Sequence, residues 1–108
     1  MAKSARRYDI YLPVTYNDGS PIPREKYDDV EDRLLGHFGG LTSQRREFPF
    51  QGKWQESAKI YEDRIVVRTA LDFRRGGSTR FIAQLKANLL REFDQLEILI
   101  TEIALRVH

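Results

Sequence analysis

The sequence predicts an α+β fold with the element order β-α-β-β-α-β, the ferredoxin-like plait, in which two helices cover one face of a four-stranded antiparallel sheet. Two observations predict it. Apolar side chains recur with a period of two over four stretches, as in strands, and at intervals of three and four over two stretches, as in helices. Clusters of glycine and proline lie between several of these stretches, where turns are expected. Many unrelated functions share this scaffold, so the fold alone names no chemistry.

The first strand and the first helix have clear patterns. A strand is expected over 8–16, and a turn rich in glycine and proline follows it. The residues expected to face the helices are Tyr8, Ile10, Leu12, Val14 and Tyr16. The first helix is expected from Arg24 to Phe38, because apolar residues recur there at helical spacing. Gly39 and Gly40 follow and are predicted to end it.

The next two strands are less regular. The second is expected over 41–48 as an edge strand, because Pro49 and Gly52 suggest a bend or a bulge. The third is expected over 58–73, where an apolar set of residues alternates with a more polar set. Arg68 belongs to the polar set, so we place it on the face of the sheet away from the helices.

The second helix and the last strand complete the pattern. The helix is expected to begin after an N-cap at Ser78 or Thr79 and to run to about Phe93, with a wide apolar stripe. The last strand is expected over 96–107. Its pattern leaves two sets of inward-facing residues open. These are Leu99, Ile103, Leu105 and Val107, or Ile98 and Ile100.

Composition restricts the class of protein. The 108 residues, 41% hydrophobic and 31% charged, are typical of one compact domain, expected over 8–108 after a basic flexible tail at 1–7. The chain has no cysteine, which excludes disulfides, thiolate metal sites and a cysteine nucleophile. It also has no His-x-x-x-His or calcium-loop pattern, so we expect neither a metal site nor a cofactor.

The targeting signals and the charge restrict the cellular location and the kinds of partner to be expected. The N-terminal segment lacks the apolar stretch of a secretory signal, and the longest apolar clusters fall far short of the roughly 20 residues that span a bilayer. We therefore expect a cytoplasmic protein with no membrane contact. The net charge is only +2, although residues 64–91 hold seven Lys and Arg against one Asp. Solvated surface explains this distribution best, and nucleic-acid binding is a weaker explanation.

The loop before the second helix is the strongest candidate for a binding site, which we interpret as an anion site. Glycine lets backbone amides approach a ligand, the start of a helix is electropositive, and arginine donates paired hydrogen bonds. The spacing differs from that of a P-loop. A turn followed by a helix cap is the simpler alternative. The candidate residues are Arg74, Arg75, Gly76, Gly77, Ser78, Thr79 and Arg80.

The open face of the sheet, on the side away from the helices, is the second candidate. The residues predicted to gather there are Tyr11, Arg68, Glu102 and Arg106, with Arg46 or Arg45. Plaits that bind RNA stack bases on aromatic side chains at this face, but only one aromatic side chain is well placed here. Burying this face or a sheet edge against a second copy is favoured, so we expect a homodimer or a protein partner.

Trp54, the only tryptophan, has two interpretations. Together with Lys53 and the segment 48–50, it forms an aromatic lid over a pocket between the hairpin and the helices. Alternatively, it covers the open end of the core, as large apolar side chains often do. The first interpretation adds Trp54 to the pocket candidates Tyr11 and Arg68.

Three short motifs in the centre of the chain resemble those of an uncharacterised bacterial family of small plait domains. They are Gly39-Gly40-Leu41-Thr42 after the first helix, Gly52-Lys53-Trp54 on the following hairpin, and Glu56-Ser57-Ala58-Lys59-Ile60 at the start of the third strand. The resemblance implies the plait fold. It implies no activity, because none is established for the family.

Groups suited to catalysis are few. His37 lies at the negative end of the first helix, which favours its charged form and explains its position without a catalytic role. The carboxylates Glu56, Glu62, Asp63 and Asp72 are expected to be solvated or salt-bridged. We therefore interpret the chain as a small binding or regulatory domain, with a non-enzymatic role favoured over an enzymatic one. The alternatives are a small dimeric enzyme with a cavity between sheet and helices and, more weakly, a nucleic-acid-binding domain.

Overall fold

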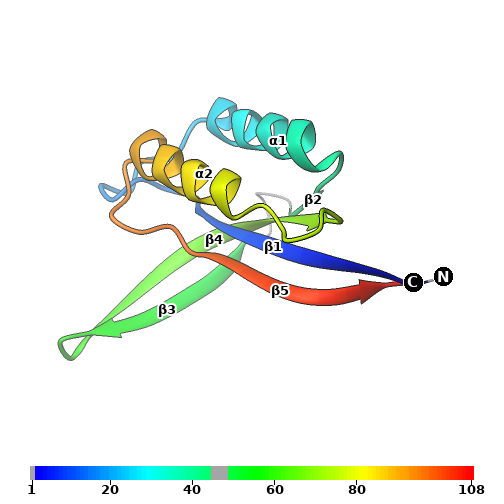
Figure 1. The fold of residues 1–108 in the computed structure, drawn as a ribbon. Coiled ribbons are helices and arrows are strands. Elements are labelled where there is room, and N and C mark those ends of the chain that lie inside the picture. The colour runs from blue at the N-terminus through cyan, green and yellow to red at the C-terminus, as the bar shows by residue number, and fades with distance from the viewer. Residues whose placement is uncertain (1, 45–48) are drawn as a thin grey trace.

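A computed structural model describes residues 2–44 and 49–108 (Figure 1). It contains two helices and five strands. In chain order these are β1 (Lys3–Pro13), α1 (Arg24–Phe38), β2 (Thr42–Ser43), β3 (Phe50–Glu56), β4 (Lys59–Asp72), α2 (Thr79–Glu92) and β5 (Ile100–Val107). The expected α+β class is confirmed. The sheet has five strands instead of the four expected. β2 lies within the predicted second strand, 41–48, whereas β3 lies beyond it and was not predicted as a separate strand.

The strands are ordered β2-β4-β1-β5, and β3 pairs with the first half of β4. All pairs are antiparallel, with β1 and β4 in the centre. Both helices lie on one face of this sheet (Figure 1). If β2 and β3 are taken as one divided strand, this is the strand order of the ferredoxin-like plait. The first and third predicted strands lie side by side in the centre, as this fold requires.

The first strand begins earlier than predicted. β1 already includes Lys3 to Arg7, which the sequence assigns to a tail, because these residues pair with β5 and, from Arg6 onward, with the end of β4. The first helix has the predicted bounds and ends at Gly39, whose φ of 82° is the left-handed conformation that glycine adopts without strain. β1 and β5 therefore extend together past the end of β4.

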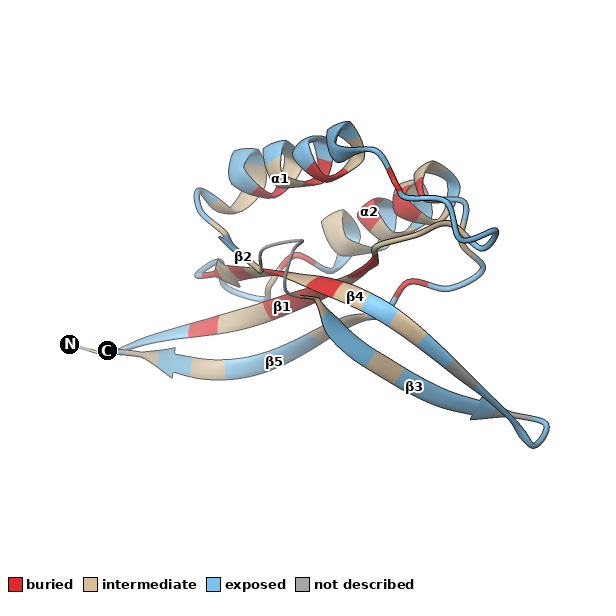
Figure 2. Cartoon of the chain, turned by 180° about the vertical axis from the view of Figure 1, so that it is seen from behind, coloured by how far each residue is buried: buried red, intermediate tan, exposed pale blue. Residues whose placement is uncertain are grey.

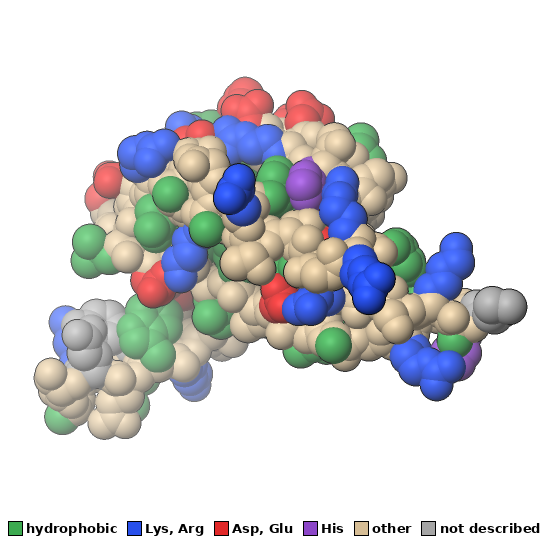
Figure 3. Space-filling view, viewed as in Figure 1, with side chains coloured by type: hydrophobic (Ala, Val, Ile, Leu, Met, Phe, Trp, Pro, Cys, Tyr) green, Lys and Arg blue, Asp and Glu red, His purple; other side chains and the backbone are tan. Residues whose placement is uncertain are grey.

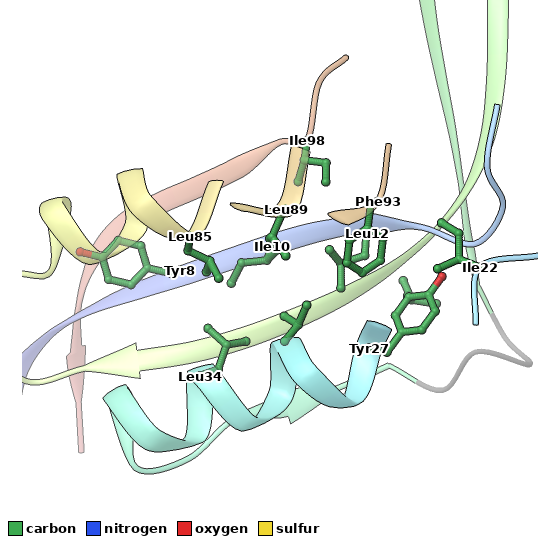
Figure 4. Close-up of a cluster of buried hydrophobic side chains, with 12 residues drawn as sticks. Tyr8, Ile10, Leu12, Ile22, Tyr27, Leu34, Leu85, Leu89, Phe93 and Ile98 are labelled. Carbon is green, nitrogen blue, oxygen red and sulfur yellow. The ribbon is translucent and has the colours of Figure 1, made fainter. Parts of the chain in front are cut away.

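The core lies between the helices and the central strands (Figure 4). The predicted inward set of β1 is confirmed, since Tyr8, Ile10 and Leu12 are fully buried. They pack against Leu34 of α1 and Leu89 of α2. Burying a side chain of this size contributes roughly 1.5–3 kcal/mol, so this cluster accounts for most of the driving force for folding. The other apolar residues of the described chain that are at most 1% exposed are Ile22, Val30, Val66, Ala70, Phe93 and Ile98.

The faces of β4 differ from the prediction. Its register with β1 turns Val66, Arg68, Ala70 and Asp72 toward the helices, and all four are buried. The apolar set therefore faces away from the helices. Alternation alone could not decide this, because it separates two faces without saying which one the helices cover. In β5 the second of the two open sets is correct, with Ile98 buried beside the core and Ile100 packed against it.

β3 and the first half of β4 form an arm, the hairpin 50–65, that projects away from the helices (Figure 2). Most of its described side chains are exposed, including Phe50, Trp54 and Ile60. At its tip, Ser57 and Ala58 both have positive φ, as a two-residue hairpin turn requires. Neither helix of the described chain is long and apolar enough to cross a membrane.

Candidate functional site

A buried carboxylate shapes the loop between β4 and α2. Asp72 is the last residue of β4 and is 1% exposed. One of its oxygens accepts the backbone N–H of Arg74 at 3.0 Å, and the other accepts the hydroxyl of Ser78 at 2.6 Å. Burial acts to raise the pKa of Asp72, but the hydrogen bonds from Ser78 and Arg74 and the charge of Arg74 outweigh it and lower the pKa. Asp72 therefore stays ionised and holds both ends of the loop.

The loop also rests on β1. Ser78 donates its backbone N–H to the hydroxyl of Tyr8 at 2.9 Å. Gly77, with φ of 77°, lies so close that an added Cβ would be 2.7 Å from Cδ of Arg6 and 2.8 Å from the Tyr8 oxygen. Burial raises the pKa of Tyr8, and Glu102 raises it further against the opposing hydrogen bond from Ser78. The positive φ of Gly77 and its close approach to Arg6 and Tyr8 leave room for glycine alone.

His37 at the end of α1 joins the same network. Its Nε2 lies 2.9 Å from Oγ of Ser78, and its ring stacks on Phe81 with centroids 3.8 Å apart. The Ser78 hydroxyl donates its hydrogen bond to Asp72, so it can only accept the one from His37. Nε2 of His37 is therefore the donor, and the neutral ring is the Nε2–H tautomer. Burial and then the charge of Arg74 lower the pKa of His37. This lowered pKa runs against the expectation that the helix end favours the charged form, because burial and the charge of Arg74 disfavour that form.

This shift predicts a pH dependence. A histidine whose folded-state pKa is lowered stabilises the fold above its ordinary pKa of 6.5, and this contribution is lost as the pH falls through the lower folded value. His37→Gln should therefore lose less stability than the wild type between about pH 7.5 and about pH 5 in urea unfolding. His108→Gln, which replaces the other, exposed histidine, is the matched control. Equal slopes for all three proteins would contradict the lowered pKa.

An open depression of about 560 Å³ lies beside this loop, where β1 and β5 continue past the end of β4. Its cationic residues are Arg6, Arg74, Arg75 and Arg106. The other lining residues are Ser4, Ala5, Phe73, Gly76, Ala104 and Leu105. In Figure 3, Lys and Arg side chains gather over the loop before α2 and toward the end of the sheet where the termini lie. We call this the basic depression.

Two of its four arginines have acidic partners. Arg6 pairs with Glu102 at 2.6 Å, and Arg74 pairs with Asp72 at 3.4 Å. Within the described residues, Arg75 and Arg106 form no ion pair or side-chain hydrogen bond. Their guanidinium groups are free to bind an added anion, and arginine matches phosphate and carboxylate geometry with two parallel donors.

The predicted loop residues divide into three groups. Arg74, Arg75 and Gly76 line the basic depression. Gly77 and Ser78 lie beneath it, in contact with β1 and Asp72. Thr79 and Arg80 are exposed on the first turn of α2 and do not line the depression. Sequence reasoning missed Arg6 and Phe73, although an antiparallel pairing of β1 with β4 would have placed Arg6 opposite Asp72.

The predicted cluster on the open face does not form. Tyr11 lies on that face, whereas Arg68, Glu102 and Arg106 face the helix side of the sheet. Arg68 is 5% exposed beneath α1, 3.6 Å from Glu31 and 5.7 Å from the ring of Tyr27. Burial lowers the pKa of Arg68 against the opposing effect of Glu31. Arg45 and Arg46 lie outside the described residues.

The pocket proposed between sheet and helices does not form either. Trp54 lies on the arm and is 46% exposed, so it neither covers a pocket there nor closes the end of the core. Tyr11 and Arg68 are on opposite faces of the sheet. The space between the helices and the central strands is occupied by the core side chains (Figure 4). The residues expected to line a catalytic cavity are thus not brought together.

A second depression, of about 480 Å³, lies at the far end of the helices and is acidic. It is lined by Tyr16, Asn17, Asp18, Glu92 and Asp94. Glu92 pairs with Arg33 at 2.7 Å, and Asp18 accepts hydrogen bonds from Ser20. Within the described ranges, no three His, Asp or Glu side chains lie close enough to hold a metal ion. The linings of the two depressions therefore differ in charge, and only the basic one suits an anion.

No family model matches the chain, and no curated protein matches it in sequence. Solved structures match its fold. A divalent cation tolerance protein from Thermus thermophilus has 10% identity and a TM-score of 0.60, with 92% of this chain and 82% of that chain covered. A phage SAM lyase in complex with S-methyl-5′-thioadenosine has 14% identity and a TM-score of 0.60, with 95% and 88% covered.

A third structure is CPII, a nitrogen regulatory PII-like protein from Thiomonas intermedia, bound to ADP, AMP and bicarbonate. It has 14% identity and a TM-score of 0.56, and the match covers 100% of this chain and 99% of that chain. Identities this low show a shared fold and nothing more. The likeness agrees with a small α/β plait. The motifs of the uncharacterised bacterial family remain a prediction.

Proposed function

We propose that the chain is a small cytoplasmic binding or regulatory domain that takes an anionic small molecule into the basic depression and works as a homodimer. The observation that supports it best is the pair of free guanidinium groups, Arg75 and Arg106, in a depression that also holds Arg6 and Arg74. The only acidic partners of these four arginines in the described chain are Glu102 and Asp72, and each of them is already paired with one arginine. A bound anion would balance the remaining positive charge of the basic depression.

The lining favours a ligand with an apolar part beside its charge. Phe73 is 52% exposed and lines the depression, as do Ala104 and Leu105. An aromatic ring at this position offers a surface for stacking, while the arginines hold a phosphate. Two proteins of the same fold hold adenine compounds, CPII with ADP and AMP and the phage lyase with S-methyl-5′-thioadenosine. We therefore propose a nucleoside phosphate as the first ligand to test.

The proposal of a homodimer is supported by the apolar face of β4. Ile65, Val67 and Leu71 face away from the helices and are only partly shielded by the sheet. Phe50 on the arm and Ile103 on β5 are about half exposed, at 58% and 46%. An apolar surface of this kind on a small domain marks a site of association. A second copy is the simplest partner, since the same surface is then buried on both chains.

Replacement of one free arginine should weaken anion binding. Arg75→Ala removes charged hydrogen bonds to the ligand, each worth about 1.5–3 kcal/mol, so its dissociation constant for AMP or ADP should rise at least roughly tenfold. Isothermal titration calorimetry at low and high salt measures this effect. Arg24→Ala, which removes an exposed arginine at the other end of the molecule, should bind like the wild type.

Inorganic phosphate separates the contribution of the charge from that of the ring. If phosphate binds and weakens with Arg75→Ala, but AMP binds no tighter than phosphate, the depression is an anion site without a nucleoside preference. If neither phosphate nor AMP produces heat with the folded wild-type protein, the proposed function is wrong. Circular dichroism of each variant shows whether it is folded.

A further inference from the structure

The outer edge of β5 is free for pairing. In the described part of the chain, β5 is the end strand of the sheet and pairs with β1 alone. The backbone N–H of Tyr11 donates a hydrogen bond to the carbonyl of Leu99, just before β5. Because backbone groups alternate in direction along a strand, the odd-numbered residues of β5 also direct their N–H and C=O groups toward β1. In an antiparallel ladder the next residues then point outward. The N–H and C=O groups of Glu102, Ala104 and Arg106 therefore face away from β1.

The side chains of this edge are complementary to themselves. If two copies pair antiparallel with Ala104 opposite Ala104, then Glu102 of each copy lies opposite Arg106 of the other. On the other face of the strand, Ile103 lies opposite Leu105, and both pairs are repeated by the two-fold symmetry. Opposite charges and apolar side chains placed directly opposite each other are the contacts that stabilise an antiparallel pair.

Other symmetric registers lack this match. Centring the pair on Glu102 places two glutamates opposite each other, and centring it on Arg106 does the same with two arginines. Like charges in these positions are unfavourable. Glu102 and Arg106 lie on the same side of β5. Glu102 pairs with Arg6 of its own chain at 2.6 Å, so in this register it lies between Arg6 and the other copy's Arg106, which forms no ion pair within its own described chain. Arg75 then remains as the free guanidinium of each basic depression.

We propose that two copies of this chain join through the free edges of β5, paired antiparallel about Ala104 with Glu102 opposite Arg106. The sheets of the two copies then form one continuous sheet, with Ile103 and Leu105 meeting on its apolar face. This inference rests on the proposed homodimer and names its surface. It places the two basic depressions near the symmetry axis, because Ala104 and Arg106 also line them.

Charge reversal tests the register directly. Arg106→Glu places two glutamates opposite each other twice, and Glu102→Arg does the same with two arginines. Each variant alone should have a dimer dissociation constant at least roughly tenfold above that of the wild type. A mixture of the two variants restores both opposite-charge pairs, so it should form a heterodimer. Sedimentation velocity of each protein and of the mixture, without added anion, gives the result.

The controls separate this inference from the proposed function. Arg24→Glu changes the net charge equally but lies at the far end of α1, and it should dimerise like the wild type. If the wild type dimerises and both reversals leave the dimer intact, the edge pairing is wrong while the homodimer stands. If the dimer then dissociates in the Val67→Lys variant, the two copies meet through the faces of their sheets that lie away from the helices. A wild type that is monomeric at high micromolar concentration overturns both, and anion binding is judged separately by calorimetry.

Discussion

Replacing Asp72 by alanine is expected to lower the free energy of unfolding by about 2–4 kcal/mol, as measured by urea denaturation at neutral pH. The carboxylate is fully buried and accepts hydrogen bonds from the Ser78 hydroxyl and the Arg74 backbone N–H. Alanine removes the acceptor of the buried Ser78 hydroxyl and of the part-buried Arg74 N–H, and this costs more than the loss of the contacts alone. The half-exposed guanidinium of Arg74 adds little, because solvent screens it.

Asp72→Asn and the pH dependence sharpen this test. The amide keeps one acceptor oxygen, so Asp72→Asn should lose clearly less stability than Asp72→Ala. The folded-state pKa of Asp72 is lowered, so its contribution is present above the ordinary value of 3.8 and is lost as the pH falls below it. Both variants should lack this part of the acid dependence. An alanine variant within about 0.5 kcal/mol of the wild type would contradict the role of Asp72.

Replacing Gly77 by alanine is expected to cost about 2–4 kcal/mol, whereas the same change at the neighbouring Gly76 should cost only about 1 kcal/mol. Both glycines have positive φ, 77° and 84°, so both variants have a strained backbone. They differ in surroundings. A Cβ at Gly76 meets nothing within 4 Å, while one at Gly77 lies 2.8 Å from the buried Tyr8 oxygen.

The difference between the two variants measures the contact and excludes backbone strain as its cause. The flexible side chain of Arg6 can move aside, but Tyr8 is fully buried, so the added methyl group breaks its hydrogen bond with Ser78. Amide hydrogen exchange at Ser78 should therefore accelerate in Gly77→Ala and remain slow in Gly76→Ala. Equal destabilisation of both variants would mean that the loop moves away from β1 at little cost.

The fold was largely predictable because its apolar patterns are local. The helix over 24–38 ends at a glycine that can adopt a left-handed conformation, and the inward face of β1 is one uninterrupted alternation. The orientation of β4 was not predictable in this way. Its apolar set faces away from the helices, and only the register with β1, a contact between distant segments, decides which set is buried. The presence of β3 beyond the predicted second strand depends equally on a pairing, here with β4.

The candidate site was predictable in part. Arg74, Arg75 and Gly76 belong to a recognisable loop before a helix, and the structure places them around one depression. Arg6 and Arg106 belong to the same depression, yet they come from opposite ends of the sequence and meet only because β1 and β5 pair. Arg68 shows the reverse case, since a charged residue in an alternating strand suggests exposure while Glu31 and Tyr27 accommodate it in the interior.

The arm also has a consequence for how this chain can vary in length. β3 pairs only with β4 in the described residues, and the arm lies outside the core formed by the helices. Removing two residues from each strand shortens the hairpin and keeps every remaining side chain on its own face, because strands alternate with a period of two. Removing one from each would place Gln55 and Ile60 next to the turn, a pair of the other hydrogen-bonding type from Glu56 and Lys59, which the same two-residue turn does not fit. Variants of this sequence should therefore tolerate arms whose two strands are each longer or shorter by an even number of residues.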